Sequence, residues 1–205
     1  MMIGIAAFLG TAFFSASGVL ASSRRQMDWI GAVVLAIVTS VGGGTLRDIL
    51  SGQLPVFWIR DPRYLLVSIG TALLLLPFLG KISFPDRKLL LPDALGLSFF
   101  TWIGCEKVFL LGHSWIVVVI LGVMTGTAGG LIRDVLSAQV PFILLKGELY
   151  AAASIPGALV FVILRFQGVS SSVAGISCFI VVLIVRLAAV RWRLMLPHSG
   201  DTSGR

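Results

Sequence analysis

The sequence has 205 residues, of which 57% are hydrophobic and only 12% charged, and its mean hydropathy is +1.01. A soluble domain carries about 25% charged residues, so this composition excludes an ordinary soluble protein. The formal net charge of +7 comes without a basic stripe or an interleaved aromatic surface, so we expect no nucleic-acid partner.

The apolar residues fall in long runs. A hydrocarbon core about 30 Å thick takes roughly 20 apolar residues of helix to cross. In chain order, we expect seven transmembrane spans at 2–22, 29–50, 63–80, 91–111, 115–136, 148–166 and 171–190. The first run has no positive charge before it, and its arginines follow it, so we expect a retained helix and not a cleaved signal peptide. The predicted fold class is an all-α integral membrane protein.

Lysine and arginine in the connecting loops set the expected orientation. With the N-terminus outside, eleven of these residues fall on the cytoplasmic side and five on the other. We therefore expect a multi-pass protein of the cell inner (plasma) membrane, with its N-terminus outside and its C-terminus in the cytoplasm.

The two halves of the chain resemble each other at a fixed offset of 86 residues. This offset aligns residues 43–55 with 129–141, and it also pairs Phe13-Phe14 with Phe99-Phe100, Gly18 with Gly104, Trp29 with Trp115 and Tyr64 with Tyr150. Each copy holds three spans, an odd number, so the second copy enters the membrane from the opposite face. We predict a first three-helix repeat at 1–84, an inverted second repeat at 85–168, a seventh transmembrane helix at 169–191 and a polar C-terminal tail at 192–205. Ion and substrate sites of many transporters lie at the interface of such repeats.

The second and fifth spans share the pattern G-G-x-x-R-D-x-L-S-x-Q-x-P. Consecutive glycines propagate a helix poorly and permit a kink. Carbonyl groups freed at a kink could act as cation ligands in a cavity. The alternative is that the glycines allow close helix packing. Because they recur in both repeats, we favour a break and expect kinked helices 2 and 5, with these candidate pore residues: Gly42, Gly43, Gly44, Gly129 and Gly130.

Arg47, Asp48, Arg133 and Asp134 follow about one turn beyond the glycines. Charges inside a bilayer usually face a cavity or a partner. They either line pore vestibules or lock the repeats by pairing across the pseudo-axis, and we favour locking over direct ion contact. The alternative is that Arg47 lies close enough to the far interface to snorkel. Adjacent helix residues point in different directions, so an arginine need not pair with its own aspartate.

Glu106 and Lys107 break the repeat, because their counterparts 86 residues earlier are uncharged. An asymmetric charge pair on a symmetric scaffold is a candidate for gating or selectivity. An ordinary interfacial pair at a helix end explains it equally well. We interpret Asp93, which follows Pro92, as a start-of-helix carboxylate with no further role.

No enzyme constellation is present: the sequence has no G-x-S-x-G, no H-E-x-x-H and no phosphate loop. We therefore expect no enzymatic activity, no catalytic residues, no metal site and no cofactor. Cys105 and Cys178 lie inside apolar runs without metal-ligand spacing, and we interpret them as small buried hydrophobes.

Two three-span repeats, each with a glycine-rich second helix followed by Arg-Asp, and then a seventh span resemble the prokaryotic branch of the trimeric intracellular cation (TRIC) channels. The related bacterial family, some of whose members are described as glycine transporters, carries the same G-G-x-x-R-D-x-L pattern. The resemblance covers roughly residues 3–190.

The resemblance implies a homotrimer in which each protomer has its own pore between the kinked second and fifth helices. By position, the kinks of the family correspond to the five glycines named above, and its charged sites correspond to the two Arg-Asp pairs. The lysine in the family's fourth span corresponds to Lys107. Animal members have Lys-Glu-Val where this chain has Glu106-Lys107-Val108, and Ala128 replaces the first glycine of the second triplet.

The sequence therefore predicts a homotrimeric, potassium-permeable channel for monovalent cations. Its expected partners are potassium or sodium as permeant ions and membrane lipids, one of which could be bound. The alternative is a secondary transporter of a small amino acid such as glycine. A third class, a membrane scaffold without transport, would require both repeated motifs to be packing devices.

Overall fold

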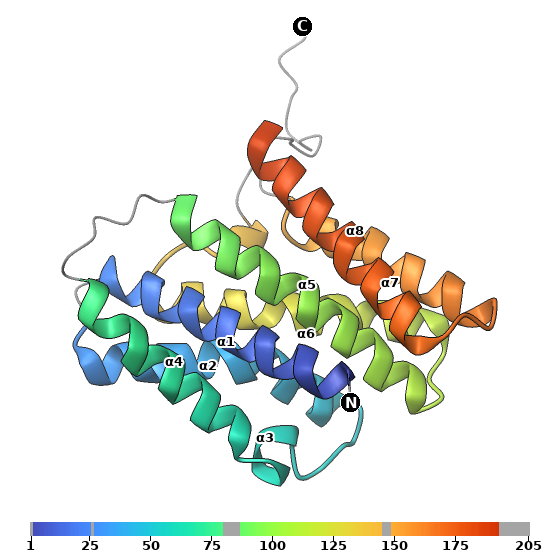
Figure 1. The fold of residues 1–205 in the computed structure, drawn as a ribbon, viewed down its shortest axis with the longest axis horizontal. Coiled ribbons are helices and arrows are strands. Elements are labelled where there is room, and N and C mark those ends of the chain that lie inside the picture. The colour runs from blue at the N-terminus through green and yellow to red at the C-terminus, as the bar shows by residue number, and fades with distance from the viewer. Residues whose placement is uncertain (1, 26, 80–86, 145–148, 193–205) are drawn as a thin grey trace, which may run out of the picture.

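The computed structural model describes residues 2–25, 27–79, 87–144 and 149–192. The predicted boundary between the two repeats, at residues 84 and 85, and the predicted tail from residue 193 onward lie outside the described residues. The elements are, in chain order, α1 (Met2–Ser23), α2 (Trp29–Leu50), α3 (Phe57–Arg60), α4 (Arg63–Leu79), α5 (Arg87–Leu110), α6 (Trp115–Leu136), the 3-10 helix η1 (Phe142–Leu144), α7 (Ala151–Phe166) and α8 (Ser171–Trp192). The fold is all-helical over the described ranges (Figure 1).

Five of these helices are long and apolar enough to cross a membrane: α1, α2, α5, α6 and α8. The other two predicted spans correspond to α4 and α7, which are apolar but have only 17 and 16 residues. The predicted bounds of the second and fifth spans coincide with those of α2 and α6. A multi-pass membrane protein follows, and the number seven stays a prediction.

Local signals explain where α2 begins and where both α2 and α6 end. The carboxylate of Asp28 accepts a hydrogen bond from the backbone N–H of Gly31 at 2.7 Å and caps the start of α2. Both helices end at a serine, Ser51 and Ser137, whose backbone N–H bonds back to the arginine carbonyl at 2.9 Å. The repeated sequence thus ends the two helices in the same way.

At the centre, α1 and α5 pack antiparallel. The rings of Phe14 and Phe100 stack with centroids 5.3 Å apart. Gly10 of α1 lies against Phe100, whereas Gly96 of α5 lies against Phe14. Because the order of these contacts reverses between the helices, their directions are opposite, as an inverted repeat requires.

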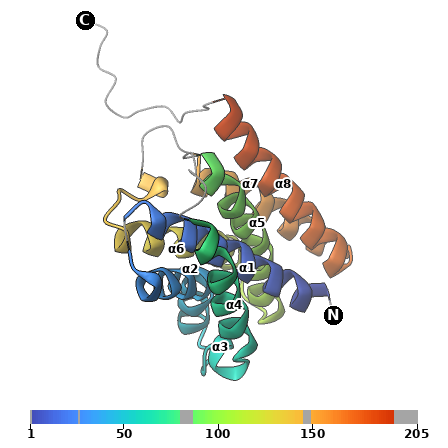
Figure 2. The ribbon, with the colours of Figure 1, turned by 60° about the vertical axis from the view of Figure 1, so that its left-hand side comes forward.

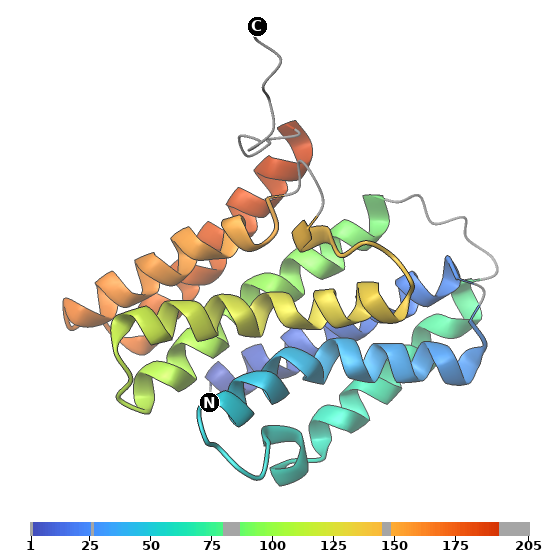
Figure 3. The ribbon, with the colours of Figure 1, turned by 180° about the vertical axis from the view of Figure 1, so that it is seen from behind.

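The remaining helices surround this pair. α2 and α4 pack on α1, α6 and α7 pack on α5, and α2 also packs on α6. Figure 2 shows α7 and α8 together on the side of the bundle away from α2 and α4. Figure 3, seen from behind, shows α3 and η1, the two short elements that follow α2 and α6, on opposite sides of the bundle.

The interior contains many hydroxyl groups, and most bond within their own helix. Thr39 donates to the carbonyl of Leu35 at 2.6 Å, and Thr125 donates to that of Leu121 at 2.5 Å. Such bonds satisfy a hydroxyl where lipid offers no partner. These hydroxyl groups therefore make the interior more polar without adding charge to it.

Candidate pore and charged clusters

The glycines of the repeated pattern lie where α2 crosses α6. A methyl group added at Gly43 would overlap the carbonyl oxygen of Thr125, and one added at Gly129 would overlap that of Thr39. The two contacts are equivalent by the 86-residue offset, and their reversed order makes α2 and α6 antiparallel. The repeated glycines therefore allow two helix backbones to touch.

This crossing changes the interpretation of the glycines. α2 is a continuous helix from Trp29 to Leu50, and α6 is continuous from Trp115 to Leu136. The close-packing alternative describes this contact. The physical reason is that glycine brings the helix axes together while each helix keeps its own hydrogen bonds. A bend at these positions stays a prediction.

The outer glycines of the pattern make room for aromatic rings. A Cβ at Gly44 would lie 2.5 Å from Cε1 of Phe57, the first residue of α3. A Cβ at Gly130 would overlap the hydroxyl of Tyr150. A Cβ added at Gly42 would lie 2.8 Å from Cδ1 of Ile132 in α6. Each end of the crossing is thus closed by an aromatic side chain.

Arg47 and Asp48 form a buried cluster at one end of α2. Nε and Nη2 of Arg47 donate to Oδ1 of Asp48 at 2.9 and 2.6 Å. The other carboxylate oxygen accepts the backbone N–H of Phe57 at 2.8 Å. The arginine is only 2% exposed, and its guanidinium carbon lies 5.7 Å from the centre of the Phe57 ring. This cluster fixes α3 onto the end of α2.

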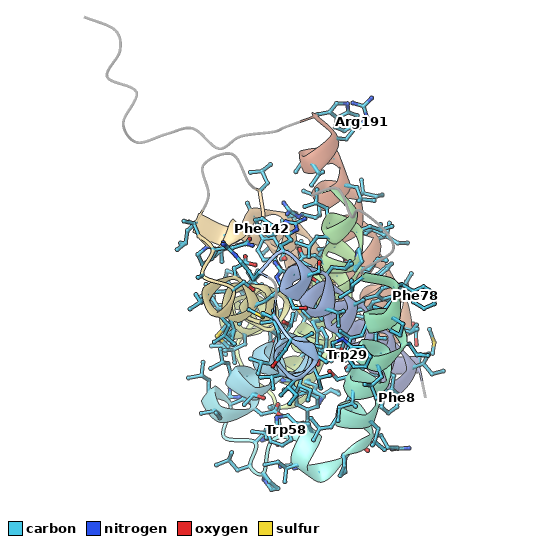
Figure 4. All side chains as sticks on the ribbon, turned by 90° about the vertical axis from the view of Figure 1, so that its left-hand side faces the viewer. Phe8, Trp29, Trp58, Phe78, Phe142 and Arg191 are labelled. Carbon is cyan, nitrogen blue, oxygen red and sulfur yellow. The ribbon has the colours of Figure 1, made fainter. Side chains whose placement is uncertain are left out.

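Arg133 and Asp134 repeat the arrangement at the end of α6. Nε of Arg133 donates to Oδ1 of Asp134 at 2.8 Å, and Oδ2 accepts the backbone N–H of Phe142 at 3.0 Å. The Arg133 guanidinium lies 5.3 Å from the Phe142 ring. In Figure 4, Phe142 and Trp58, which mark η1 and α3, lie well apart on the bundle.

The partners of these charges differ from those that the sequence suggested. Each arginine pairs with its own aspartate, so the Arg-Asp pairs do not bond to each other across the pseudo-axis. Arg47 is also buried, and Asp48 holds its guanidinium. The cause is the backbone N–H after each helix, which turns the aspartate back toward the arginine beside it. Sequence spacing along one helix does not contain that contact.

Asp93 is not a start-of-helix carboxylate without a further role, as its sequence position had suggested. It lies inside α5, which begins at Arg87, and it is completely buried. Its Oδ1 accepts hydrogen bonds from Nη1 of Arg133 at 2.5 Å and from the hydroxyl of Tyr150 at 3.1 Å. Arg133 also donates to the hydroxyl of Ser17 in the first repeat. The available signal was a carboxylate in an apolar run whose counterpart, position 7, is alanine.

A cavity of about 340 Å³ lies beside Arg47. Its walls combine three cations, two carboxylates, other polar groups and apolar side chains: Arg47, Asp48, Ser51, Gln53, Phe57, Arg60, Asp61, Tyr64, Lys107, Leu110 and Leu111. The Lys107 ammonium lies 5.2 Å from the centre of the Phe57 ring. Hydrogen bonds from Arg63 hold the pKa of Asp61 below its usual value of 3.8, so this carboxylate is ionised and already paired.

Glu106 and Lys107 are adjacent in the chain, but their side chains point to different places. Lys107 lines the cavity, whereas Glu106 is 1% exposed and does not line it. Trp102, one turn before Glu106, packs its indole on Gly175 of α8. Residues one turn apart share a helix face, so Glu106 is directed toward α8. The two residues therefore act in different places, and only Lys107 belongs to the cavity.

Known proteins share the repeat described above. The model of the glycine transporter family matches the chain twice, at residues 4–79 and 90–165. The UPF0126 membrane protein of Vibrio cholerae serotype O1 is 44% identical over 92% of this chain and 79% of its own length. The UPF0126 inner membrane protein YadS of Escherichia coli strain K12 is 41% identical over 96% of each chain.

The solved structures point to a channel fold. The TRIC trimeric intracellular cation channel orthologue from Rhodobacter sphaeroides has a TM-score of 0.89 and 36% identity, over 94% of this chain and 99% of its own. The chain belongs to the prokaryotic TRIC channel family. Its similarity to TRIC cation channels supports a cation channel and indicates a non-enzymatic protein. Within this TRIC family member, the crossing of α2 and α6 and the two Arg-Asp clusters are the candidate pore.

Proposed function

We propose that the chain forms a homotrimer of the inner membrane whose protomers each conduct monovalent cations, including potassium, between α2 and α6. In this proposal α4 and α7 complete seven spans, the N-terminus is outside, and the cavity beside Arg47 is the outer mouth. The permeant species are ions, and no cofactor takes part. The observation that carries the proposal is the α2–α6 crossing, which lies between two polar ends of the bundle and occurs in a fold similar to TRIC channels.

The path would run from the cavity, past the glycines, to the Arg133 cluster. The Gly43 and Gly129 contacts close it at the crossing, and the Phe57 and Tyr150 side chains close it on either side. Conduction therefore needs α2 and α6 to separate by a small distance. Hydroxyl and carbonyl groups at the crossing would then replace part of the hydration shell of a cation.

A small amino acid such as glycine is the second candidate solute. The match to the glycine transporter family favours it, as does a cavity whose free donors could hold a carboxylate. Inverted repeats are common in transporters that work by alternating access. A transporter would expose the crossing to each side in turn, whereas a channel would open it to both.

One experiment distinguishes these candidates. The purified protein is placed in a planar bilayer with asymmetric potassium chloride, and single-channel currents are recorded. Discrete unitary currents that reverse near the potassium potential support the channel. Silence in the bilayer together with counterflow of labelled glycine in liposomes would reject the channel and support the transporter.

A further inference from the structure

The two arginine clusters are equivalent in sequence, but one contains a carboxylate that the other lacks. In the second repeat, Asp93 accepts hydrogen bonds from Nη1 of Arg133 and from the hydroxyl of Tyr150. The residues 86 positions earlier are Arg47, Tyr64 and, in place of the aspartate, Ala7. The first repeat thus keeps the donors and has lost the acceptor.

The first cluster also has the space that the second has filled. Arg47 and Tyr64 both line the cavity of about 340 Å³. Arg47 uses Nε and Nη2 on Asp48. Over the described residues, no acceptor pairs with Nη1 of Arg47 or with the Tyr64 hydroxyl. Buried or half-buried donors of this kind normally have a partner.

Lys107 adds a positive charge to the same cavity. Its ammonium lies over the Phe57 ring and makes no ion pair within the part of the chain that the structure describes. The two carboxylates of the wall are occupied: Asp48 by Arg47 and the Phe57 N–H, and Asp61 by Arg63. The cavity therefore offers free donors and positive charge, and neither carboxylate of its wall is unpaired.

We infer that this cavity binds a small carboxylate anion, which takes the place that Asp93 occupies in the second repeat. One oxygen of the anion accepts from Nη1 of Arg47 and the Tyr64 hydroxyl, and the Lys107 ammonium balances its charge. The second repeat shows the expected geometry, because Arg133 and Tyr150 both donate to one carboxylate oxygen of Asp93. Charge-assisted bonds of this type are the stronger hydrogen bonds in proteins.

A bound carboxylate would also change the mouth proposed above. Without it, unpaired positive charge opposes the entry of a cation, and with it the local field becomes more negative. This consequence rests on the proposed function. The binding itself does not, because it needs only the cavity and can be measured on a protein that conducts nothing.

The test is a titration of carbon-13-labelled acetate into the full chain in nanodiscs, observed by NMR line broadening. Acetamide, a neutral molecule of the same shape, is the control ligand. We expect saturable binding of acetate and none of acetamide. Absence of saturable acetate binding, or equal binding of both ligands, would overturn the inference.

Substitutions locate the site. Tyr64→Phe and Lys107→Gln should each weaken acetate binding roughly tenfold, the first by removing one hydrogen bond to a charged group and the second by removing the balancing charge. Tyr150→Phe, the same change at the equivalent position whose partner is Asp93, should leave acetate affinity unchanged, as should Arg191→Gln, which removes one exposed charge elsewhere. Equal weakening by Tyr64→Phe and Tyr150→Phe would refute the location.

A converse variant tests the equivalence directly. Ala7→Asp places a carboxylate where Asp93 lies in the second repeat, and it should abolish acetate binding by occupying the same donors. A folded Ala7→Asp protein that still bound acetate with the original affinity would show that the two clusters are not equivalent. Potassium currents of the protein are also recorded, in acetate and in chloride. Absence of currents in both salts is a failure of the channel proposal, whereas the acetate titration alone decides whether the anion binds.

Discussion

Gly43 of α2 lies directly on the backbone carbonyl of Thr125 in α6, with no room for a methyl group between the two helices. The same contact recurs between Gly129 and Thr39. A carbonyl on a helix backbone cannot move aside as a flexible side chain can. These two contacts therefore set the distance between α2 and α6, and a pore between them must start from this closed crossing.

Gly43→Ala should destabilise the protein, because the added methyl forces α2 and α6 apart. Overpacking of this kind costs about 1–3 kcal/mol. We expect a lower unfolding temperature of the purified protein in detergent. Gly70→Ala is the matched control, since Gly70 lies inside α4 with open space around it. There the better helix propensity of alanine should add up to about 1 kcal/mol. Equal effects at the two positions would contradict the role of the crossing.

Gly44→Leu should abolish cation flux and leave a folded oligomer. The larger side chain would occupy the space of the Phe57 ring at the end of the crossing. Gly130→Leu should do the same at the other end, where Tyr150 lies. Flux is measured in liposomes, and size-exclusion chromatography reports assembly. Unchanged flux in either folded variant would remove that end of the crossing from the proposed path.

Asp93→Asn should destabilise the protein more than Tyr150→Phe. The first change removes a buried negative charge that faces Arg133, and breaking a buried ion pair costs about 3–5 kcal/mol. The second removes one hydrogen bond, which contributes about 0.5–1.5 kcal/mol. Because both groups meet at one carboxylate oxygen, the double variant should lose less stability than the sum of the single variants. Additive losses in thermal unfolding would show that the contacts are independent.

Lys107→Ala should change potassium conductance more than it changes assembly. The lysine lines the proposed mouth, where its charge opposes cation entry. We expect a larger unitary current, with the greatest effect at low salt, where charges are screened least. Arg191→Ala, at an exposed position near the end of α8, is the control. A loss of trimer stability with unaltered conductance would make this lysine a structural residue.

Much of the fold could be predicted from the local sequence. The bounds of α2 and α6 coincide with the predicted spans, because apolar runs of the required length end at polar residues. The repeated glycines lie at the α2–α6 crossing, and the Arg-Asp pairs lie near the ends of the same two helices. The short elements α3 and η1 were missed. They depend on bonds from Asp48 to Phe57 and from Asp134 to Phe142, which join residues nine and eight positions apart.

The sequence by itself determined that this is a helical membrane protein with an internal repeat, because hydropathy and spacing act along the chain. Only the tertiary structure decided how the repeated residues are used. Arg133 meets Asp93 and Ser17, which are 40 and 116 residues away. It also showed that glycines expected to break two helices bring their backbones into contact. Contacts of this length depend on which helix faces meet, and packing of the whole bundle decides that.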